Sequence, residues 1–353
     1  MKTSRGPGRR RPRGIGRLDA VKSETDHSRV PATSGFKADF LPLLACPSCD
    51  GDLQLRSEED QEAVVLSGAL ECAEGHSYPI QGGIPRFVES EWYAENFGFE
   101  WNLHNRTQLD NDNSKESEET FIEKTGFNRQ DLDGKLVLDV GCGMGRFSDV
   151  VSRWGGTVIG IDLTSAVDAA NANLGTRPNV HIAQANVFEL PFREKTFDYI
   201  FSIGVLHHTP STKDAFDQLP KLLKPGGRVA IWLYSTRMCR WCWTSDFYRI
   251  FTTRLSKKTL HNVSRVAGPM YRLRKWLELR SRRLSSFVFL LLPTSTHDNA
   301  EWRVLDTFDW YSPKYQWKHS DIEVREWYLA QGLTDLKSLQ IETSLQGQRP
   351  EVD

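Results

Sequence analysis

The sequence predicts an α/β fold in which helices cover both faces of a parallel sheet, with a small metal-binding module before it and a helical insertion within it. Two observations support this prediction. Short apolar runs recur at 137–140, 158–161 and 229–234, as expected of strands buried on both faces. A CxxC pair followed by a further cysteine and a histidine precedes the first run, and such a set is typical of a metal site.

The first apolar run ends in a glycine-rich turn. Residues 137–147 read VLDVGCGMGRF, with glycines at alternate positions after Asp139. Glycines at this spacing let the chain turn sharply and bring bare backbone against a nucleotide-like ligand before a helix begins. The order differs from the GxGxxG of dinucleotide-binding folds and resembles motif I of class I S-adenosylmethionine-dependent methyltransferases. The resemblance implies a Rossmann-like sheet and a cofactor contact at Asp139, Gly141, Cys142, Gly143 and Gly145.

Two further strands extend the predicted cofactor site. The run VIGID at 158–162 ends in Asp162, a carboxylate placed to accept hydrogen bonds from both ribose hydroxyls, and Leu163 follows it. The segment 180–192, VHIAQANVFELPF, resembles the third strand of the family and the loop beside adenine. The family often has an aspartate there, whereas this chain has Asn186, followed by Val187. The neutral side-chain carbonyl of Asn186 can still accept, as a weaker partner.

Strands four and five follow in the order that the family shows. Residues 197–210, FDYIFSIGVLHHTP, resemble the fourth strand and its exit, and 222–234, LLKPGGRVAIWLY, the next crossover and the fifth strand. Together the motifs over about 132–234 resemble the ubiquinone-methyltransferase-like branch of class I enzymes. The resemblance implies transfer of a methyl group from S-adenosylmethionine.

The N-terminal module carries four potential metal ligands: Cys46, Cys49, Cys72 and His76. Three thiolates and an imidazole form a closed tetrahedral set, which predicts structural zinc. CPSC together with SYPIQGGIPRFV resembles the zinc-ribbon-like segment of small methyltransferase-activator proteins and, less closely, the finger of bacterial 23S rRNA guanine methyltransferases. Two alternatives stay open: a metal-free hairpin, and a site that Cys239 and Cys242 complete in place of Cys72 and His76.

Composition limits the partners without choosing a function. The 353 residues suggest about two domains by length, and the net charge of −1 gives no general attraction for polyanions. The Arg-, Gly- and Pro-rich residues 1–36 are expected to be a disordered tail, which is either solvated or in contact with nucleic acid or an anionic surface. No run of about eighteen apolar residues predicts a membrane span, and no signal peptide is visible, so a cytoplasmic location is expected.

The segments on either side of the core are expected to build the acceptor site. Trp101 and Gln108 belong to an aromatic helical arm that either faces the methyl donor or packs on the domain. The basic, aromatic insertion 236–304 predicts a lid that holds a lipid-like substrate or contacts a membrane surface, or whose arginines are merely solvated. The segment from Asp306 resembles one common in this branch, and the resemblance implies an aromatic loop that lies over the acceptor. The expected division is 1–36 tail, 37–90 zinc module, 91–130 arm, 131–235 core, 236–304 lid and 305–353 substrate loop with the last strands.

Methyl transfer from a sulfonium needs alignment of the reacting atoms and, for a hydroxyl or amine acceptor, removal of a proton. The candidate bases are His207, His208, Asp309 and His319. Three functions compete: a methyltransferase acting on a small-molecule or lipid-linked acceptor, an RNA methyltransferase that grips RNA with its zinc module and tail, and a non-catalytic regulatory protein that retains the cofactor site. The near-neutral charge weighs against RNA. Protein partners are not predicted.

Overall fold

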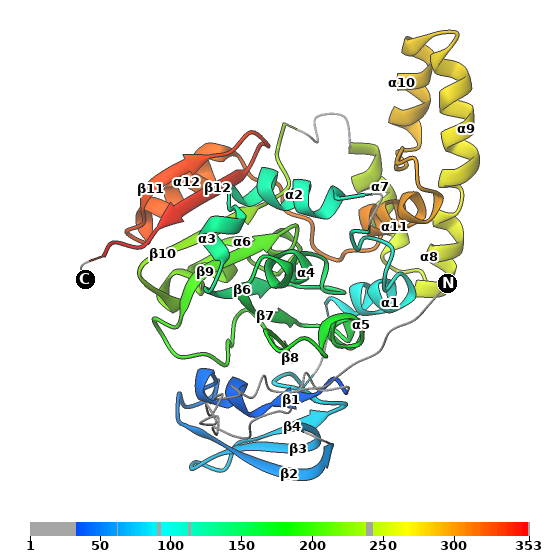
Figure 1. Cartoon of the computed structure of the whole chain (residues 1–353). Helices are drawn as coiled ribbons and strands as arrows, with labels where there is room; N and C mark the ends of the chain where they lie inside the picture. Colours follow the sequence, from blue (N-terminus) through cyan, green and yellow to red (C-terminus); the bar gives the residue numbers. More distant parts are fainter. Residues whose placement is uncertain (1–32, 62, 90–92, 112–113, 238–242, 352–353) are drawn as a thin grey trace, which may run out of the picture. The chain divides into compact units, whose positions relative to one another are not determined.

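The computed structural model describes residues 33–61, 63–89, 93–111, 114–237 and 243–351. The expected tail falls outside these ranges except for its last four residues, and so does the alternative metal pair, Cys239 and Cys242. The described part contains two sheets. One belongs to the N-terminal module and the other to the core (Figure 1).

The core is a seven-stranded sheet with helices on both sides (Figure 1). Its strand order is β11-β12-β10-β9-β6-β7-β8, and the five strands from β10 to the edge strand β8 are parallel. β12 pairs antiparallel with both β10 and β11. The fold class that the apolar runs predict is therefore confirmed. The bounds are β6 Leu136–Val140, β7 Thr157–Asp162, β8 Val180–Gln184, β9 Phe197–Ile203, β10 Leu223–Trp232, β11 Thr334–Ser338 and β12 Ser344–Gln348.

Pro225, Gly226 and Gly227 fall inside the fifth parallel strand, β10. The pairing of β10 with β9 jumps from Leu223 opposite Phe197 to Arg228 opposite Tyr199, so the intervening residues bulge out of the ladder. A proline has no N–H to give to a ladder, which explains why the bulge forms here. The strand resumes in register beyond it and carries Trp232 to the edge of the sheet where the other parallel strands end.

Within the described residues, seven α-helices flank the core sheet or pack on its flanking helices. α2 packs against β9, β10 and β12, whereas α4 and α5 pack against β6, β7 and β8. α12 ends at Ala330, and Gly332 follows it with a φ of +70°. The bounds are α1 Glu95–Leu103, α2 Glu116–Thr125, α3 Arg129–Leu132, α4 Arg146–Arg153, α5 Ala166–Leu174, α6 Thr212–Asp217 and α12 Asp321–Ala330.

The N-terminal module is a five-stranded antiparallel sheet whose apolar side chains join the core of the larger sheet. Its Lys37 ammonium donates to the carbonyl oxygens of Gly175 (2.9 Å) and Val180 (2.7 Å), and Arg86 donates to Gln184 Oε1 (2.7 Å). These contacts fix the module beside β8. Its elements are β1 Phe36–Lys37, a 3-10 helix Ala38–Leu43, β2 Leu53–Gln61, β3 Val64–Cys72, β4 Ser77–Gln81 and β5 Ile84–Pro85.

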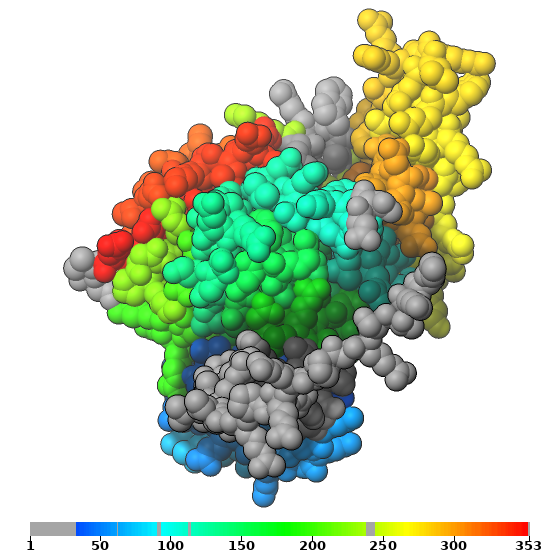
Figure 2. All heavy atoms as spheres, in the orientation of Figure 1, coloured from blue at the N-terminus to red at the C-terminus, as the bar shows by residue number. Residues whose placement is uncertain are grey.

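The insertion between β10 and α12 is helical, as expected. It contains α7 Trp243–Thr252, α8 Lys257–Ser264, α9 Ala267–Glu278, α10 Arg282–Leu291 and α11 Ala300–Tyr311. Figure 2 shows atoms of α9 and α10 in yellow and orange at the surface. No helix in the described ranges is both long and apolar enough to cross a bilayer.

One expectation about this region is wrong. The aromatic segment that begins at Asp306 is not a loop up to Tyr311, because it forms the second half of α11. Asn299 caps this helix by accepting hydrogen bonds from the backbone N–H groups of residues 301 and 302. Leu305 and Phe308 lie buried one turn apart, so packing against the other lid helices sustains the helix past its aromatic residues.

Candidate active site

A cavity of about 350 Å³ lies where β6, β7, β9 and β10 end at their carboxyl edge. Open α/β sheets bind ligands at this edge, and the volume lies in the range of small-molecule sites. The glycine turn and the end of β7 line one part of the cavity, while residues of α1, α2 and α11 line another. One cavity thus joins the predicted cofactor site to the arm and the lid.

The glycine turn requires its first glycine. Gly141 has a φ of +82°, and a Cβ atom at this position would lie 2.4 Å from both methyl carbons of Val205. Gly143 has a φ of +53°, and its backbone N–H donates to Asp162 Oδ2 at 3.0 Å. The turn therefore presents bare backbone to the cavity, as the alternate glycines predict.

Asp162 closes the same side of the cavity. Its Oδ1 accepts hydrogen bonds from the backbone N–H of Thr164 (2.9 Å) and from Thr164 Oγ1 (2.7 Å). Oδ2 accepts from Gly143 and has a further lone pair for a ligand. Burial raises the pKa of this carboxyl group, and these hydrogen bonds oppose the shift.

The remaining cofactor candidates divide into two groups. Those that line the cavity are Cys142, Leu163, Val187, Trp101 and Gln108, in addition to Gly141, Gly143 and Asp162. Gly145, Asp139 and Asn186 do not belong to its lining. Gly145 instead caps α4 with a φ of +91°.

Asp139 and Asn186 both have partners within the protein. Asp139 accepts from Ser148 Oγ at 2.7 Å, and burial raises the pKa of its carboxyl group to about 7. Asn186 Oδ1 accepts from the backbone N–H of Phe188 at 3.2 Å. Both side chains thus hold the local backbone, Asp139 through α4 and Asn186 through the turn after β8.

The four candidate bases are not equivalent. His319 lies between Glu323 Oε1 (3.0 Å from Nδ1) and Thr212 Oγ1 (2.9 Å from Nε2), outside the cavity lining. His207 also lies outside the lining; it is fully buried, and its ring centroid is 4.0 Å from that of Tyr234 in a tilted arrangement. Burial lowers the pKa of His207 well below its ordinary value. Of the four, His208 and Asp309 line the cavity.

His208 has a defined tautomer. Its Nδ1 lies 2.9 Å from the carbonyl oxygen of Tyr315, which can only accept, so Nδ1 carries the proton. Burial lowers the pKa of the imidazole to about 4, and the ring is therefore neutral at pH 7 with its lone pair on Nε2. Nε2 is buried and has no hydrogen-bond partner among the described residues. It is a free acceptor in the wall of the cavity.

Asp309 is the acidic counterpart of His208. Burial, and secondly the charge of Asp306, raise the pKa of this carboxyl group to about 7, although a hydrogen bond from Tyr234 opposes the shift. Asp306 accepts from Ser295 Oγ at 2.8 Å and lines the cavity as well. A carboxyl group with a pKa near neutrality can take up or release a proton at physiological pH.

The cavity also contains charged and aromatic side chains that sequence reasoning missed. Lys124 Nζ lies 3.4 Å from the ring centroid of Trp232, and burial, followed by the charge of Arg146, lowers its pKa to about 7. Arg146 Nε donates to Ser117 Oγ at 3.0 Å, and its guanidinium lies 5.0 Å from the ring centroid of Trp302. No motif marks Lys124 or Trp302, whereas Arg146 directly follows the glycine turn in the first motif.

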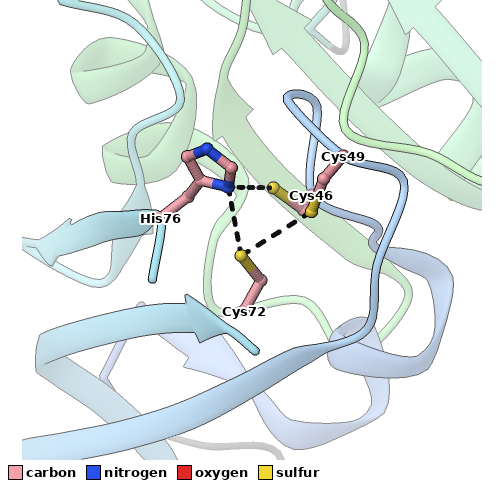
Figure 3. Close-up of side chains that lie close together, drawn as sticks. All are labelled: Cys46, Cys49, Cys72 and His76. Atoms are coloured by element: carbon pink, nitrogen blue, oxygen red, sulfur yellow. Dashed lines mark hydrogen bonds between the residues drawn. The ribbon is translucent and has the colours of Figure 1, made fainter. Parts of the chain in front are cut away.

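The four metal candidates of the N-terminal module come together (Figure 3). Their ligand atoms all lie within 4.8 Å of one another. Cys49 Sγ is 3.7 Å from Cys72 Sγ, and His76 Nδ1 is 3.6 Å from Cys46 Sγ and 3.2 Å from Cys72 Sγ. A tetrahedral zinc ion with Zn–S bonds of about 2.3 Å separates its sulfurs by about 3.8 Å. The arrangement fits zinc without rearrangement of the backbone.

Comparison with known proteins finds similarity between the core and methyltransferases. Residues 138–231 match the family model described as "Methyltransferase domain". Phosphoethanolamine N-methyltransferase 2 of Caenorhabditis elegans is 36% identical over 29% of this chain and 24% of its own length. The tRNA U34 carboxymethyltransferase of Klebsiella pneumoniae is 35% identical over 29% and 31%. The 24-methylenesterol C-methyltransferase 2 of Oryza sativa subsp. japonica is 26% identical over 41% and 42%.

A solved structure aligns with a larger part of the chain, but at lower sequence identity. The complex of the Haloferax volcanii Trm112 methyltransferase activator with a putative methyltransferase aligns with 72% of this chain and 98% of the matched chain, at 15% identity and a TM-score of 0.41. The chain spans less than half the length of each of the three curated relatives named above. The matched region and the parallel sheet agree with each other: residues 138–231, which match a methyltransferase domain, contain β7, β8 and β9 and most of β6 and β10.

Proposed function

We propose that this protein transfers a methyl group from S-adenosylmethionine to a small-molecule or lipid-linked acceptor by direct in-line displacement. The observation that carries the proposal is the single cavity that joins the glycine turn and Asp162 to the wall containing His208, Asp309 and Trp310. Its two ends suit a donor and an acceptor held next to each other. Such alignment is the main contribution that a protein makes to a direct displacement.

In this proposal the glycine turn and the end of β7 hold the donor. Asp162 accepts hydrogen bonds from the ribose hydroxyls, while Leu163 and Val187 flank the adenine ring. Trp101 and Gln108 of the arm cover the turn. When bound, S-adenosylmethionine supplies an electrophilic methyl carbon on a sulfonium, and no covalent protein nucleophile is needed.

The acceptor end offers two groups that can take a proton. His208 Nε2 has a free lone pair, and Asp309 ionises near neutral pH. Of the two, Asp309 is the better match for a hydroxyl or ammonium acceptor at pH 7, because the ideal base has a pKa near the working pH. His208, with a pKa of about 4, is a weaker base and suits the role of an acceptor that orients the substrate.

We assign the N-terminal cluster to structural zinc. Three thiolates and one imidazole fill all four positions of a tetrahedral ion, so no position remains open for a substrate or an activated water. The metal would then hold the CPSC turn to the hairpin of β3 and β4 and stabilise the module that packs beside β8.

A transfer assay tests the proposal. Purified protein and donor labelled on the methyl group are offered to a cell extract that is then separated into RNA, protein, lipid and small-molecule fractions. We expect label in the lipid or small-molecule fraction, lost in Asp162→Ala and retained in the surface control Asp335→Ala. Label in RNA would favour the second candidate, an RNA methyltransferase, in keeping with relatives named for tRNA. Donor binding without transfer to any fraction would favour the non-catalytic alternative.

A further inference from the structure

The lid concentrates exposed apolar side chains. Among the described residues, twelve of the seventeen exposed large apolar side chains lie between positions 247 and 291. The most exposed is Leu279, at 88%, in the turn between α9 and α10. Soluble surfaces rarely gather so many, and a cluster of this kind marks a binding surface.

The exposed side chains follow helical spacing. Leu273 and Trp276 lie one turn apart on α9, and Leu284 and Phe287 lie one turn apart on α10. Each pair therefore lies on one face of its helix. α9 and α10 pack against each other as an antiparallel pair, yet these two faces remain exposed (Figure 1).

The same segment is strongly basic. Residues 247–291 contain eleven lysines and arginines and a single acid, Glu278, while the whole chain has a net charge of −1. Arg280, Arg282 and Arg283 flank the exposed Leu279 at the turn. The segment that exposes most of these apolar side chains thus carries a net charge of +10, from eleven basic residues and one acid.

We propose that α9, α10 and the turn between them form a docking surface for an anionic lipid bilayer. Basic residues next to exposed leucine and aromatic side chains bind such a surface through attraction to acidic headgroups and burial of the apolar groups at the acyl boundary. A second copy of the chain would bring two positive surfaces together. An RNA would pair with the arginines but would leave the exposed leucines in water.

The docking surface adjoins the proposed acceptor site through α11. This helix packs against α7, α8 and α9, and it places Asp306, Asp309 and Trp310 in the cavity. A lipid-linked acceptor at the bilayer surface would therefore lie near the wall of the cavity that the lid builds. This link to the acceptor rests on the proposed function, whereas docking to the bilayer does not depend on catalysis.

Co-sedimentation of the full chain with vesicles tests the inference. We expect binding to vesicles of phosphatidylcholine with 30 mol% phosphatidylserine and at least tenfold weaker binding to phosphatidylcholine alone. Arg280→Ser, Arg282→Ser and Arg283→Ser combined should weaken binding about a hundredfold, at about fivefold per charge. The matched control combines Arg129→Ser, Lys135→Ser and Arg325→Ser, which lie exposed elsewhere and should leave binding within about threefold.

The apolar contribution is tested separately. Leu279→Ser with Phe287→Ser should weaken vesicle binding at least tenfold, while Ile322→Ser with Leu329→Ser, exposed on α12, should not. Thermal unfolding of each variant verifies that it remains folded. Equal vesicle binding by the two double variants would overturn the proposal. It would also be overturned if the protein bound poly(U) RNA more strongly than the acidic vesicles and if Leu279→Ser did not weaken that RNA binding. Because no methyl donor is present, a failure here leaves the proposed activity standing.

Discussion

Replacing Asp162 by alanine tests the donor site most directly. The change removes the acceptor of three hydrogen bonds, which the carboxylate receives from Gly143 and Thr164 at 2.7 to 3.0 Å. It also removes the proposed partner of the two ribose hydroxyls. The variant should therefore lose donor affinity while it keeps its fold, since the N–H groups left behind border the cavity and can be hydrated.

The size of the effect follows from hydrogen bonds to a charged acceptor, each of which contributes about 1.5–3 kcal/mol. Loss of two such bonds to the ribose weakens binding of S-adenosylmethionine by about 3–6 kcal/mol, or roughly a hundredfold to ten-thousandfold. Asp162→Asn keeps one carbonyl acceptor in place and should lose less, about tenfold to a hundredfold.

Isothermal titration calorimetry with S-adenosylmethionine measures these affinities, and the surface variant Asp335→Ala serves as the matched control. The expected order of affinity is control, then Asp162→Asn, then Asp162→Ala. If the alanine variant binds the donor within threefold of the unaltered protein, the ribose assignment is wrong.

Three further changes test other parts of the molecule. Cys46→Ser should reduce bound zinc from one per chain to none and unfold the module, as seen by metal analysis and limited proteolysis, whereas Ser48→Ala should keep the metal. Gly141→Ala should cost about 2–5 kcal/mol in unfolding free energy through positive φ and overlap with a neighbouring valine, against about 1 kcal/mol for Gly134→Ala, which has positive φ but open space. In a rate profile, transfer should rise with pH through about 7 and Asp309→Asn should abolish this rise. Because the folded pKa of Asp309 is raised to about 7, its contribution to stability is present below pH 4 and lost as the pH rises through 7, so Asp309→Asn should melt higher than the parent at pH 8.

The sequence was most informative where local chemistry and burial agree. Strands such as β6 and β7 are buried on both faces, so their apolar runs could be recognised without tertiary information. The alternate glycines predicted a sharp turn, and the structure shows why Gly141 is needed there: its positive φ and the side chain of Val205 both exclude a Cβ atom. The metal cluster could be predicted because its four ligands follow a known spacing, although they meet only after two hairpins fold.

The acceptor wall was harder to predict because it exists only in tertiary structure. Lys124 lies on a helix with no motif and reaches the cavity by stacking on Trp232 from another element. The histidine pair looked equivalent in sequence, yet successive residues in the short helix after β9 turn in different directions, so His208 lines the cavity and His207 does not. The family resemblance suggested an aromatic loop from Asp306, whereas the residues up to Tyr311 continue the helix α11, in which several positions over successive turns are buried.

Burial of the ionisable side chains near the acceptor wall is costly for folding, and this cost supports a functional role for these side chains. Glu100 is fully buried and neither of its carboxylate oxygens has a hydrogen-bond partner among the described residues. Its burial, and secondly the charges of Asp309 and Asp306, raise its pKa well above the ordinary value. A fold selected for stability alone would place apolar side chains here. Perturbed acids gathered beside Lys124 and His208 instead match the way that active sites are built to move protons.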